Sequence, residues 1–511
     1  MHSPDYRAVR IRTETNGRGT AKTIAVAGLI LLQFLLLACL YVYLGVAFRW
    51  FTIVSLTLSL LAAVHVLSGP RNGLSKAVWI LFLLVAFGFG YVVYILSDER
   101  IFFRKARRRY AAVFARAEAA RPDFRPPSSQ AVAGDARFLY EAGGFAPYTD
   151  TAVRYFPSGA QLFDDVLARL QTAERYIYIE FFIVADGVLL DRLLDVLRDR
   201  AAHGVDVRLI YDDMGSHGTL SRRAKRRLTE AGVRIRPFNR LLPRFTVALN
   251  YRDHRKIVAI DGQTAYTGGS NLADEYINEK RMHGYWKDTG VRLDGPAADA
   301  FTLFFLRQWE FLTGEKAGYA ALSRETGSGR GPVVIPFADG PDHALSVGKN
   351  AYLNVIAGAA ERLYIMTPYF IPDEALSDLL AVKARSGVDV RLILPGVPDK
   401  RFVYAMSLNY AEKLIGSGVK IYRMRDSFVH SKLMLSEKCV VIGSINLDLR
   451  SFYQQFECAL LTDDPSAVRA VADDFAATLP ECERVGDDSP PGRRALSRVF
   501  AGFLQLFAPF M

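Results

Sequence analysis

The chain has 511 residues, a formal net charge of +11 and a hydrophobic fraction of 50%. This length leaves room for two or three domains, and the hydrophobic fraction is high for a soluble protein. The charge favours an anionic partner, either nucleic acid or an acidic membrane surface. No HExxH, CxxC or EF-hand pattern occurs, and the four cysteines lack the spacing of metal ligands. The sequence therefore implies no metal or other cofactor.

The apolar excess lies near the N-terminus, in three segments almost free of charge: residues 23–47, 51–67 and 77–96. About twenty apolar residues are needed to cross a bilayer, so the first and third are long enough and the second is short. The first segment is too long for a cleaved signal peptide, and others follow it. Buried helices of a soluble core are the alternative. We predict a membrane anchor in residues 1–100 with two or three apolar segments.

Basic residues flank this anchor on both sides. Six lie between residues 98 and 110, which argues that this side of the membrane is cytoplasmic. Residues 1–22 are also basic, which conflicts with three full crossings. One apolar segment could therefore be re-entrant, or the first two could form a hairpin in one leaflet. We expect residues 101–150 to form a basic juxtamembrane segment and a linker that contains several prolines.

The remainder of the chain contains an internal repeat. Residues 173–179 recur as 360–366, and residues 204–210 recur as 387–393, in the same order. Within each copy, short runs rich in Ile, Val and Tyr alternate with helical patterns. This alternation predicts α/β units on a largely buried mixed sheet.

The repeat predicts two related domains, which we place at residues 151–325 and 326–490. The tail at 491–511 carries its arginines early and its bulky apolar residues late. It is compatible with an interfacial amphipathic helix or with packing on the preceding domain.

Each half carries one copy of a short polar motif at the start of an apolar run. The first is His254-x-Lys256 with Asp261 five residues after the lysine, and the second is His430-x-Lys432 with Glu437 in the acidic position. Residues two apart on a strand point to the same face, so each imidazole should lie beside its ammonium group. Asp261 and Gly262 predict a hairpin turn after the first motif.

A Gly-x-x-Asn pattern follows each motif and ends in Asn271 and Asn446. Their amides could donate hydrogen bonds to phosphate oxygens, although isolated asparagines more often form turns. Ser270 and Ser444 are weaker candidates because the two patterns place their serines differently. Two histidines, two lysines and two asparagines together suit a doubly charged, phosphorane-like transition state.

The repeated motif resembles the HKD motif of the phospholipase D superfamily, and within that superfamily the chain resembles bacterial cardiolipin synthases from about residue 50 to the C-terminus. Further matches surround Tyr369, Phe370 and Arg450, which are candidate substrate-pocket residues; core packing is an equal alternative for the two aromatic residues. The resemblance implies two α/β/α sandwich domains that share one active site. It also implies a multi-pass protein of the inner (plasma) membrane with cytoplasmic catalytic domains.

The resemblance suggests catalytic roles for the motif residues. One histidine attacks phosphorus and the other acts as acid and base, and His254 is the expected nucleophile. Lys256 and Lys432 hold the phosphate oxygens. In this superfamily a downstream carboxylate orients each histidine, and we expect Asp288 to serve His254 and Glu457 to serve His430. Asp261 and Glu437, though part of the motifs, sit at predicted turns and have a mainly structural role in this interpretation.

The reaction implied is transfer of a phosphatidyl group between two phosphatidylglycerols, giving cardiolipin and glycerol without a cofactor. A phospholipase D hydrolase or another phosphatidyltransferase is the nearest alternative. A membrane-tethered nuclease or nucleic-acid binder is the second, disfavoured by the three apolar segments and by the lack of aromatic–basic interleaving. We expect phosphatidylglycerol and anionic membrane lipids as partners, and no nucleic acid.

Overall fold

The structure is a computed structural model. It describes residues 17–47, 49–69, 73–97, 104–118, 121–240, 251–319, 322, 325–341, 343 and 345–486. The tail at 491–511 and the first part of the basic segment, at 98–103, lie outside the described residues.

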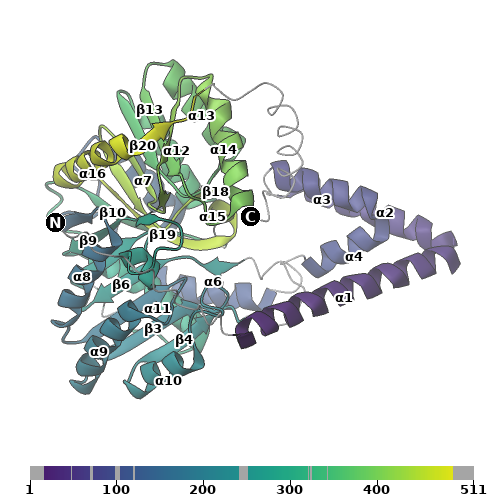
Figure 1. Cartoon of the computed structure of the whole chain (residues 1–511), viewed down its shortest axis with the longest axis horizontal. Coiled ribbons are helices and arrows are strands. Elements are labelled where there is room, and N and C mark those ends of the chain that lie inside the picture. The colour runs from purple at the N-terminus through teal and green to yellow at the C-terminus, as the bar shows by residue number, and fades with distance from the viewer. Residues whose placement is uncertain are drawn as a thin grey trace, which may run out of the picture.

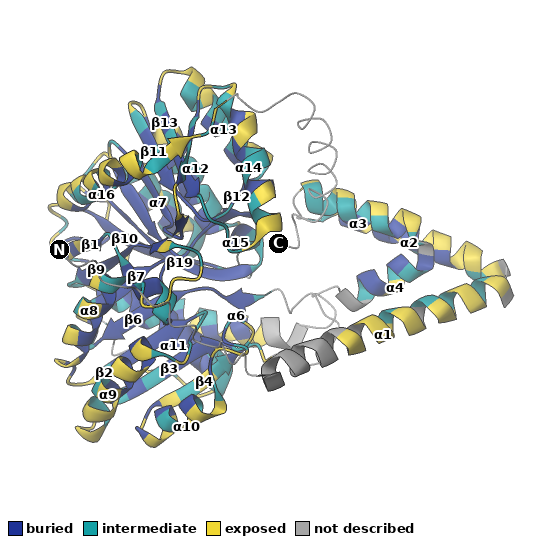
Figure 2. Cartoon of the chain, viewed as in Figure 1, coloured by how far each residue is buried: buried dark blue, intermediate teal, exposed yellow. Residues whose placement is uncertain are grey.

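Among the described residues, four helices precede the α/β body and project from one side of it (Figure 1): α1 Gly17–Ala47, α2 Arg49–Ser68, α3 Gly73–Val85 and α4 Phe87–Ser97. Helix α2 lies against α3 and α4, and Trp79, Leu83 and Tyr94 are buried between them. Gly88 allows close approach of two helices, because a Cβ atom there would lie 2.4 Å from Cβ of Ser55. Many apolar side chains on α1 and α2 face outward (Figure 2).

By length and composition, one helix among the described residues is long and apolar enough to cross a membrane, Trp50–Ser68. The predicted segment at 77–96 is not one continuous helix. It is divided at Ala86 into α3, which has 13 residues, and α4, which has 11. Each is shorter than the roughly twenty residues that a perpendicular crossing needs.

The first half of the body is a seven-stranded mixed sheet. Its strands, in spatial order, are β1 Ala152–Phe156, β9 Gly290–Asp294, β7 Thr264–Gly268, β6 Lys256–Ile260, β2 Tyr176–Phe181, β3 Asp206–Asp212 and β4 Arg234–Phe238. Strands β2, β3 and β4 are parallel, and the other pairings are antiparallel. The helices of this half are α8 Gly159–Leu170, α9 Val188–Ala202, α10 Arg222–Glu230 and α11 Ala298–Thr313, with the short η2 Asp274–Ile277.

The second half repeats this order. Its main strands are β10 Val334–Asp339, β19 Gln455–Thr462, β17 Val440–Gly443, β16 Leu433–Ser436, β11 Arg362–Met366, β13 Asp389–Pro395 and β14 Lys420–Met424, and β20 Cys482–Arg484 is added at the edge. The helices are α12 Val347–Gly358, α13 Glu374–Arg385, α14 Arg401–Ile415, α15 Leu449–Tyr453 and α16 Pro465–Thr478, with the short η4 Leu479–Glu481. Both sheets thus have the duplicated mixed topology that the repeat predicts.

In the described part of the connection between the N-terminal helices and the body, the chain forms α6 Arg104–Glu118 and α7 Ala133–Gly143. Helix α6 packs on α11, and α7 packs on α12 and β10. One continuous buried cluster runs from Tyr110 on α6 through Phe301 and Trp309 on α11 to Phe337 on β10. Because this cluster joins both sheets, the two halves share a core rather than meeting only at their surfaces (Figure 2).

Short ladders cross between the halves. Strand β5 Arg252–Asp253 leaves the first half to pair in parallel with the start of β19. Strand β8 Tyr285–Lys287 of the first half pairs in parallel with β15 Ser427–Val429 of the second. A further small ladder, β12 Phe370–Ile371 with β18 Leu447–Asp448, lies within the second half.

Candidate active site

The acidic residue of each motif fixes the turn that follows its strand. Asp261 and Gly262 both have positive φ, 54° and 73°, as a two-residue hairpin turn requires. The Asp261 carboxylate accepts hydrogen bonds from three backbone N–H groups at residues 174–176, each at 2.8 Å. Glu437 accepts from the equivalent N–H groups at residues 360–362, at 2.9 to 3.3 Å. Both carboxylates therefore tie one strand to its neighbour, and neither contacts a motif histidine.

The spacing predicted that each motif histidine lies on a strand together with its lysine. In the structure neither histidine lies within a strand. His254 falls between β5 and β6, and His430 falls between β15 and β16. At these points the chain leaves a cross-half ladder and enters its own sheet. The N–H of His254 donates to the carbonyl of Phe456 at 2.8 Å, and the N–H of His430 donates to the carbonyl of Lys287 at 2.7 Å. Each histidine is thus held by the opposite half.

The carboxylate partners are exchanged relative to the prediction. Nδ1 of His254 lies 2.9 and 3.0 Å from the two carboxylate oxygens of Glu457. Nδ1 of His430 lies 2.6 Å from Oδ2 of Asp288. The prediction that these two carboxylates orient the histidines agrees with this geometry, but the assignment of Asp288 to His254 and Glu457 to His430 was wrong. The cross-half ladders explain why, since each one brings a histidine next to the carboxylate-bearing strand of the other half.

The carboxylate beside His254 is held by two serines. Ser451 donates to Oε1 of Glu457 at 2.8 Å, and Ser444 donates to Oε2. Ser444 was only a weak candidate for phosphate binding, and Ser451 was not a candidate. No local sequence pattern marks either residue, because both act through a carboxylate that the fold brings to them.

The motif lysines are fully buried beside their histidines. Nζ of Lys256 donates to the carbonyl of His254 at 2.5 Å, and Nζ of Lys432 donates to the carbonyl of His430 and lies 2.8 Å from its Nδ1. Gly269 of the first half lies against the second motif, since a Cβ there would come within 2.9 Å of the carbonyl oxygen of His430. The two motifs therefore meet in one site.

Aromatic rings that the sequence analysis missed flank both histidines. The ring of Phe182 is 5.1 Å from the imidazole of His254. Around His430 the rings of Tyr276, Trp286 and Phe428 lie at 5.3, 5.5 and 5.7 Å. These rings exclude water from the imidazoles and restrict their rotation.

The two asparagines differ in their surroundings. Oδ1 of Asn271 accepts from the N–H of Ile183 at 3.0 Å, and its Nδ2 donates to the hydroxyl of Tyr276 at 2.6 Å. Asn271 thus positions the ring that lies against His430. Oδ1 of Asn446 is buried and has no hydrogen-bond partner within the described chain, and the same holds for the hydroxyl of Ser270.

The three substrate-pocket candidates, Tyr369, Phe370 and Arg450, differ in their surroundings. Phe370 is fully buried and pairs with Leu447 in a ladder, so core packing describes it. The hydroxyl of Tyr369 donates to Asp399 at 2.6 Å, and its ring is 6.5 Å from that of Phe428. The charge of Arg450 is close enough to His254 to help lower its pKa.

Burial dominates the electrostatics of the site. It lowers the pKa of His254 well below its usual value, and the charges of Lys256 and Lys432 lower it further. Burial and Lys432 lower the pKa of His430 to about 4, although the carboxylate of Asp288 acts in the opposite direction. The pKa of Lys256 falls to about 8 and that of Lys432 to about 7, mainly through burial. The imidazoles of the free site are therefore neutral near pH 7.

Protonation and tautomer follow from these contacts. Burial raises the pKa of Glu457 well above its usual value, and Lys256 and the two serines offset only part of that rise. A neutral His254 that donates from Nδ1 to this carboxylate keeps its lone pair on Nε2. That nitrogen is then available as a nucleophile. Among the described residues no group of three or more His, Cys, Asp or Glu side chains could hold a metal ion.

Comparisons with known proteins agree with this site. The family model described as cardiolipin synthase, PLD-like domain, matches residues 166–283 and 352–479. Cardiolipin synthase 2 of Bacillus cereus is 36% identical over 366 residues, which cover 71% of this chain and 71% of that protein. The chain belongs to the cardiolipin synthase family of phospholipase D-like proteins.

Other relatives extend the match. Cardiolipin synthase of Listeria monocytogenes is 33% identical over 429 residues, covering 81% of this chain and 89% of that protein. An uncharacterized protein of Streptococcus mutans is 38% identical over 379 residues. The crystal structure of phosphatidylserine synthase from Haemophilus influenzae superposes with a TM-score of 0.55 at 16% identity, covering 73% of this chain and 99% of that one. The predicted duplicated phospholipase D-like α/β fold is thus confirmed.

Proposed function

We propose that this member of the cardiolipin synthase family transfers a phosphatidyl group between two phosphatidylglycerols and releases glycerol. The observation that carries the proposal is the pair of histidines, each bonded through Nδ1 to a buried carboxylate from the other half. Two imidazoles with exchanged carboxylates and two buried lysines suit a two-step displacement at phosphorus.

In the first step Nε2 of His254 attacks the phosphorus of one phosphatidylglycerol. A P–N bond forms, the P–O bond to the terminal glycerol breaks, and protonated His430 gives its proton to the leaving oxygen. In the free site burial and the charge of Lys432 keep His430 neutral, although the Asp288 carboxylate favours its protonated form, so the acid role requires that the bound substrate raise the pKa of His430. A bound anionic phosphodiester offsets the lysine charges, which favours the protonated form further.

In the second step neutral His430 removes the proton from the terminal hydroxyl of a second phosphatidylglycerol. That oxygen attacks phosphorus, the P–N bond breaks, and cardiolipin leaves with His254 regenerated. Lys256 and Lys432 balance the negative charge on the non-bridging oxygens in both steps. Asn271 and Asn446 are proposed as further phosphate donors, while Asp261 and Glu437 support the motif strands.

The proposal also places the protein in a membrane. Outward-facing apolar side chains on α1 and α2 and the apolar helix Trp50–Ser68 support an N-terminal anchor within residues 1–100. We place two or three segments in the inner (plasma) membrane and the catalytic domains, residues 151–325 and 326–490, on its cytoplasmic side. Anionic lipids suit the net charge of +11.

The test uses purified protein in vesicles that contain phosphatidylglycerol as the sole lipid, followed by lipid mass spectrometry. Equimolar cardiolipin and glycerol are expected. Phosphatidic acid without cardiolipin would instead identify a hydrolase, and a product that requires another added alcohol would identify a different phosphatidyltransferase. Cleavage of single-stranded or duplex DNA with no lipid product would replace the proposal by a nuclease.

A further inference from the structure

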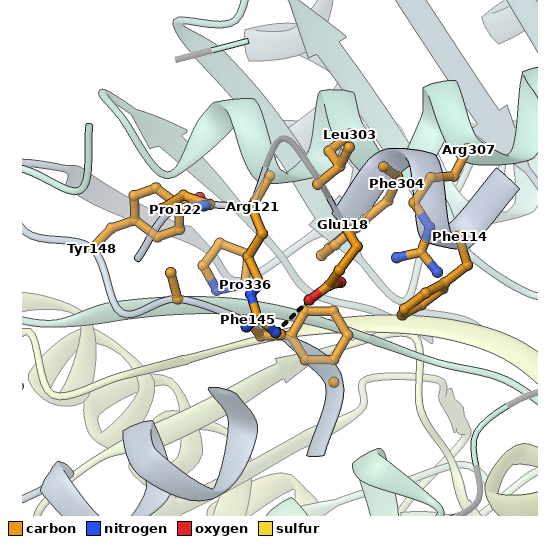
Figure 3. A pocket seen from close by; sticks show the side chains of 15 residues that line it. Phe114, Glu118, Arg121, Pro122, Phe145, Tyr148, Leu303, Phe304, Arg307 and Pro336 are labelled. Carbon is orange, nitrogen blue, oxygen red and sulfur yellow. Dashed lines mark ion pairs between the residues drawn. The ribbon is translucent and has the colours of Figure 1, made fainter. Parts of the chain in front are cut away.

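A cavity lies away from the histidines, where α6 and the residues that follow it meet α11. It encloses about 30 Å³, roughly twice the space that one ordered water needs. Figure 3 shows two arginines in its wall, Arg307 from α11 and Arg121 from the segment after α6. No residue of either HKD motif lines this cavity.

Arg307 is a largely buried cation with no ion-pair partner among the described residues. The residue is only 8% exposed, and its guanidinium lies over the ring of Phe114, 4.1 Å from the ring centroid (Figure 3). Within the described part of the chain it makes no ion pair and no hydrogen bond. Guanidinium stays protonated in proteins, and buried charges are normally paired because desolvating a lone ion is costly.

The rim of the cavity supplies a second cation and keeps the site accessible. Arg121 pairs with Glu118 there, and their side chains are 32% and 38% exposed. Gly144 forms the facing wall with φ of 74°, and a Cβ atom there would lie 2.8 Å from Cδ of Arg121. Glycine therefore keeps the space beside this arginine open.

We propose that this cavity, between Arg307 and Arg121, is a binding site for a phosphate group. Planar guanidinium groups bind tetrahedral oxyanions with two parallel hydrogen bonds, and the bound anion would supply the missing partner of Arg307. The phosphate could come from a lipid headgroup or from a soluble ion, since the chemistry is shared. Because α6 follows the N-terminal helices in the chain, occupancy would strengthen its attachment to α11. This phosphate site is argued independently of the reaction proposed for the histidines.

Thermal unfolding of the full chain in detergent tests the site, with sodium phosphate titrated against sodium chloride at constant ionic strength. Saturating phosphate should raise Tm by roughly 1–3 °C. Arg307→Met should lose that part of the rise which belongs to this cavity, since phosphate bound at the HKD site is retained in the variant. In chloride alone it should be about as stable as the wild type, because Arg307 has no ion pair or hydrogen bond to lose within the described chain and Met can still pack on Phe114.

Two further variants should change the phosphate affinity in opposite directions. Arg121→Met should weaken phosphate binding, whereas Glu118→Gln should strengthen it by removing the competing carboxylate. Arg198→Met, on the exposed face of α9, serves as the matched control and should behave like the wild type. If Arg307→Met does not fold, this pair of rim variants decides the question, and unchanged phosphate affinity in both would refute the site.

The source of the phosphate is resolved in nanodiscs of neutral phosphatidylcholine with and without phosphatidic acid. A stabilisation that depends on Arg307 and appears only with phosphatidic acid identifies a lipid headgroup. The same dependence in detergent with free phosphate identifies a soluble anion. If neither anion gives a response that depends on Arg307 or Arg121, the arginine is held by its stacking on Phe114 alone and the proposal is wrong.

Discussion

Nδ1 of His254 lies 2.9 Å from Oε1 of Glu457, although 203 residues separate them in the chain. The matching bond from His430 to Asp288 spans 142 residues in the opposite sense. Each motif is therefore completed by the other half, and neither half alone carries a histidine with its carboxylate. This exchange makes the two domains one catalytic unit.

The exchanged partners lead to a prediction that separates the two histidines. Glu457→Gln should impair attack by His254, whereas Asp288→Asn should impair proton transfer by His430, each lowering kcat by about 10²–10⁴-fold. Rapid-quench trapping of the phosphatidyl-enzyme gives the measurement. Glu457→Gln should slow formation of the phosphatidyl-enzyme. Asp288→Asn should slow both its formation and its breakdown by a second lipid.

A serine variant provides the control for the two carboxylate variants. Ser451→Ala removes one donor to the Glu457 carboxylate but keeps its charge, so its effect should be much smaller than that of Glu457→Gln. A Glu457→Gln enzyme that forms the intermediate at the wild-type rate would show that His254 is not the nucleophile.

Removing either imidazole should remove one indispensable group. We expect His254→Ala and His430→Ala each to abolish most cardiolipin formation, and the double variant to be hardly worse, because groups that act as a unit are not additive. Circular dichroism and melting curves should remain close to those of the wild type. Near-normal turnover in either single variant would argue for two independent sites.

The acidic residues of the motifs should affect stability rather than chemistry. Asp261→Asn and Glu437→Gln each weaken a carboxylate that accepts three backbone N–H bonds, at a cost of about 1–3 kcal/mol in unfolding free energy. Turnover of the folded protein should change little. Loss of turnover without loss of stability would reverse the roles assigned to these carboxylates and to Asp288 and Glu457.

The contribution of Glu437 should depend on pH. Partial burial opposes its ionisation, but the backbone donors outweigh burial, and its pKa lies below the usual 4.5. Stability from this residue is therefore complete above about pH 4.5 and is lost as pH falls through the lower folded-state pKa. The difference in melting temperature between wild type and Glu437→Gln should shrink over that acidic range.

Much of the fold followed from the repeat, and the limits of that inference are physical. The segments at 173–179 and 360–366 became the equivalent strands β2 and β11 because their apolar patterns are local. The hairpin at Asp261 was also predicted, since a turn with positive φ depends on two adjacent residues. The pairing of His254 with Glu457 was not, because it depends on β5 joining a strand of the other half. Local patterns contain no information on such an exchange.

Metal chelation should leave the chemical step unchanged. Lys256 and Lys432 place positive charge beside the two motif histidines, and in the proposed reaction this charge does the work that a metal ion would otherwise do. Turnover with EDTA should equal turnover without it in vesicles diluted with neutral lipid, where effects of divalent ions on the anionic surface are small. Activity that is lost in EDTA and restored by one equivalent of a single metal would contradict this prediction.

The lysines should set the alkaline side of the pH profile. Burial lowers the pKa of Lys432 to about 7 and that of Lys256 to about 8, and both must be protonated to bind phosphate. In the free enzyme kcat/KM should therefore fall as pH rises through about 7 to 8, whereas kcat should fall at higher pH because the bound anion favours the charged lysines.

Lys432→Arg keeps its charge at every accessible pH, so its residual activity should lose the fall near pH 7 and keep the one near pH 8. Lys420→Arg, which replaces a partly exposed lysine paired with Asp389, should retain the wild-type profile. If Lys432→Arg keeps the fall near pH 7, a group other than Lys432 controls it.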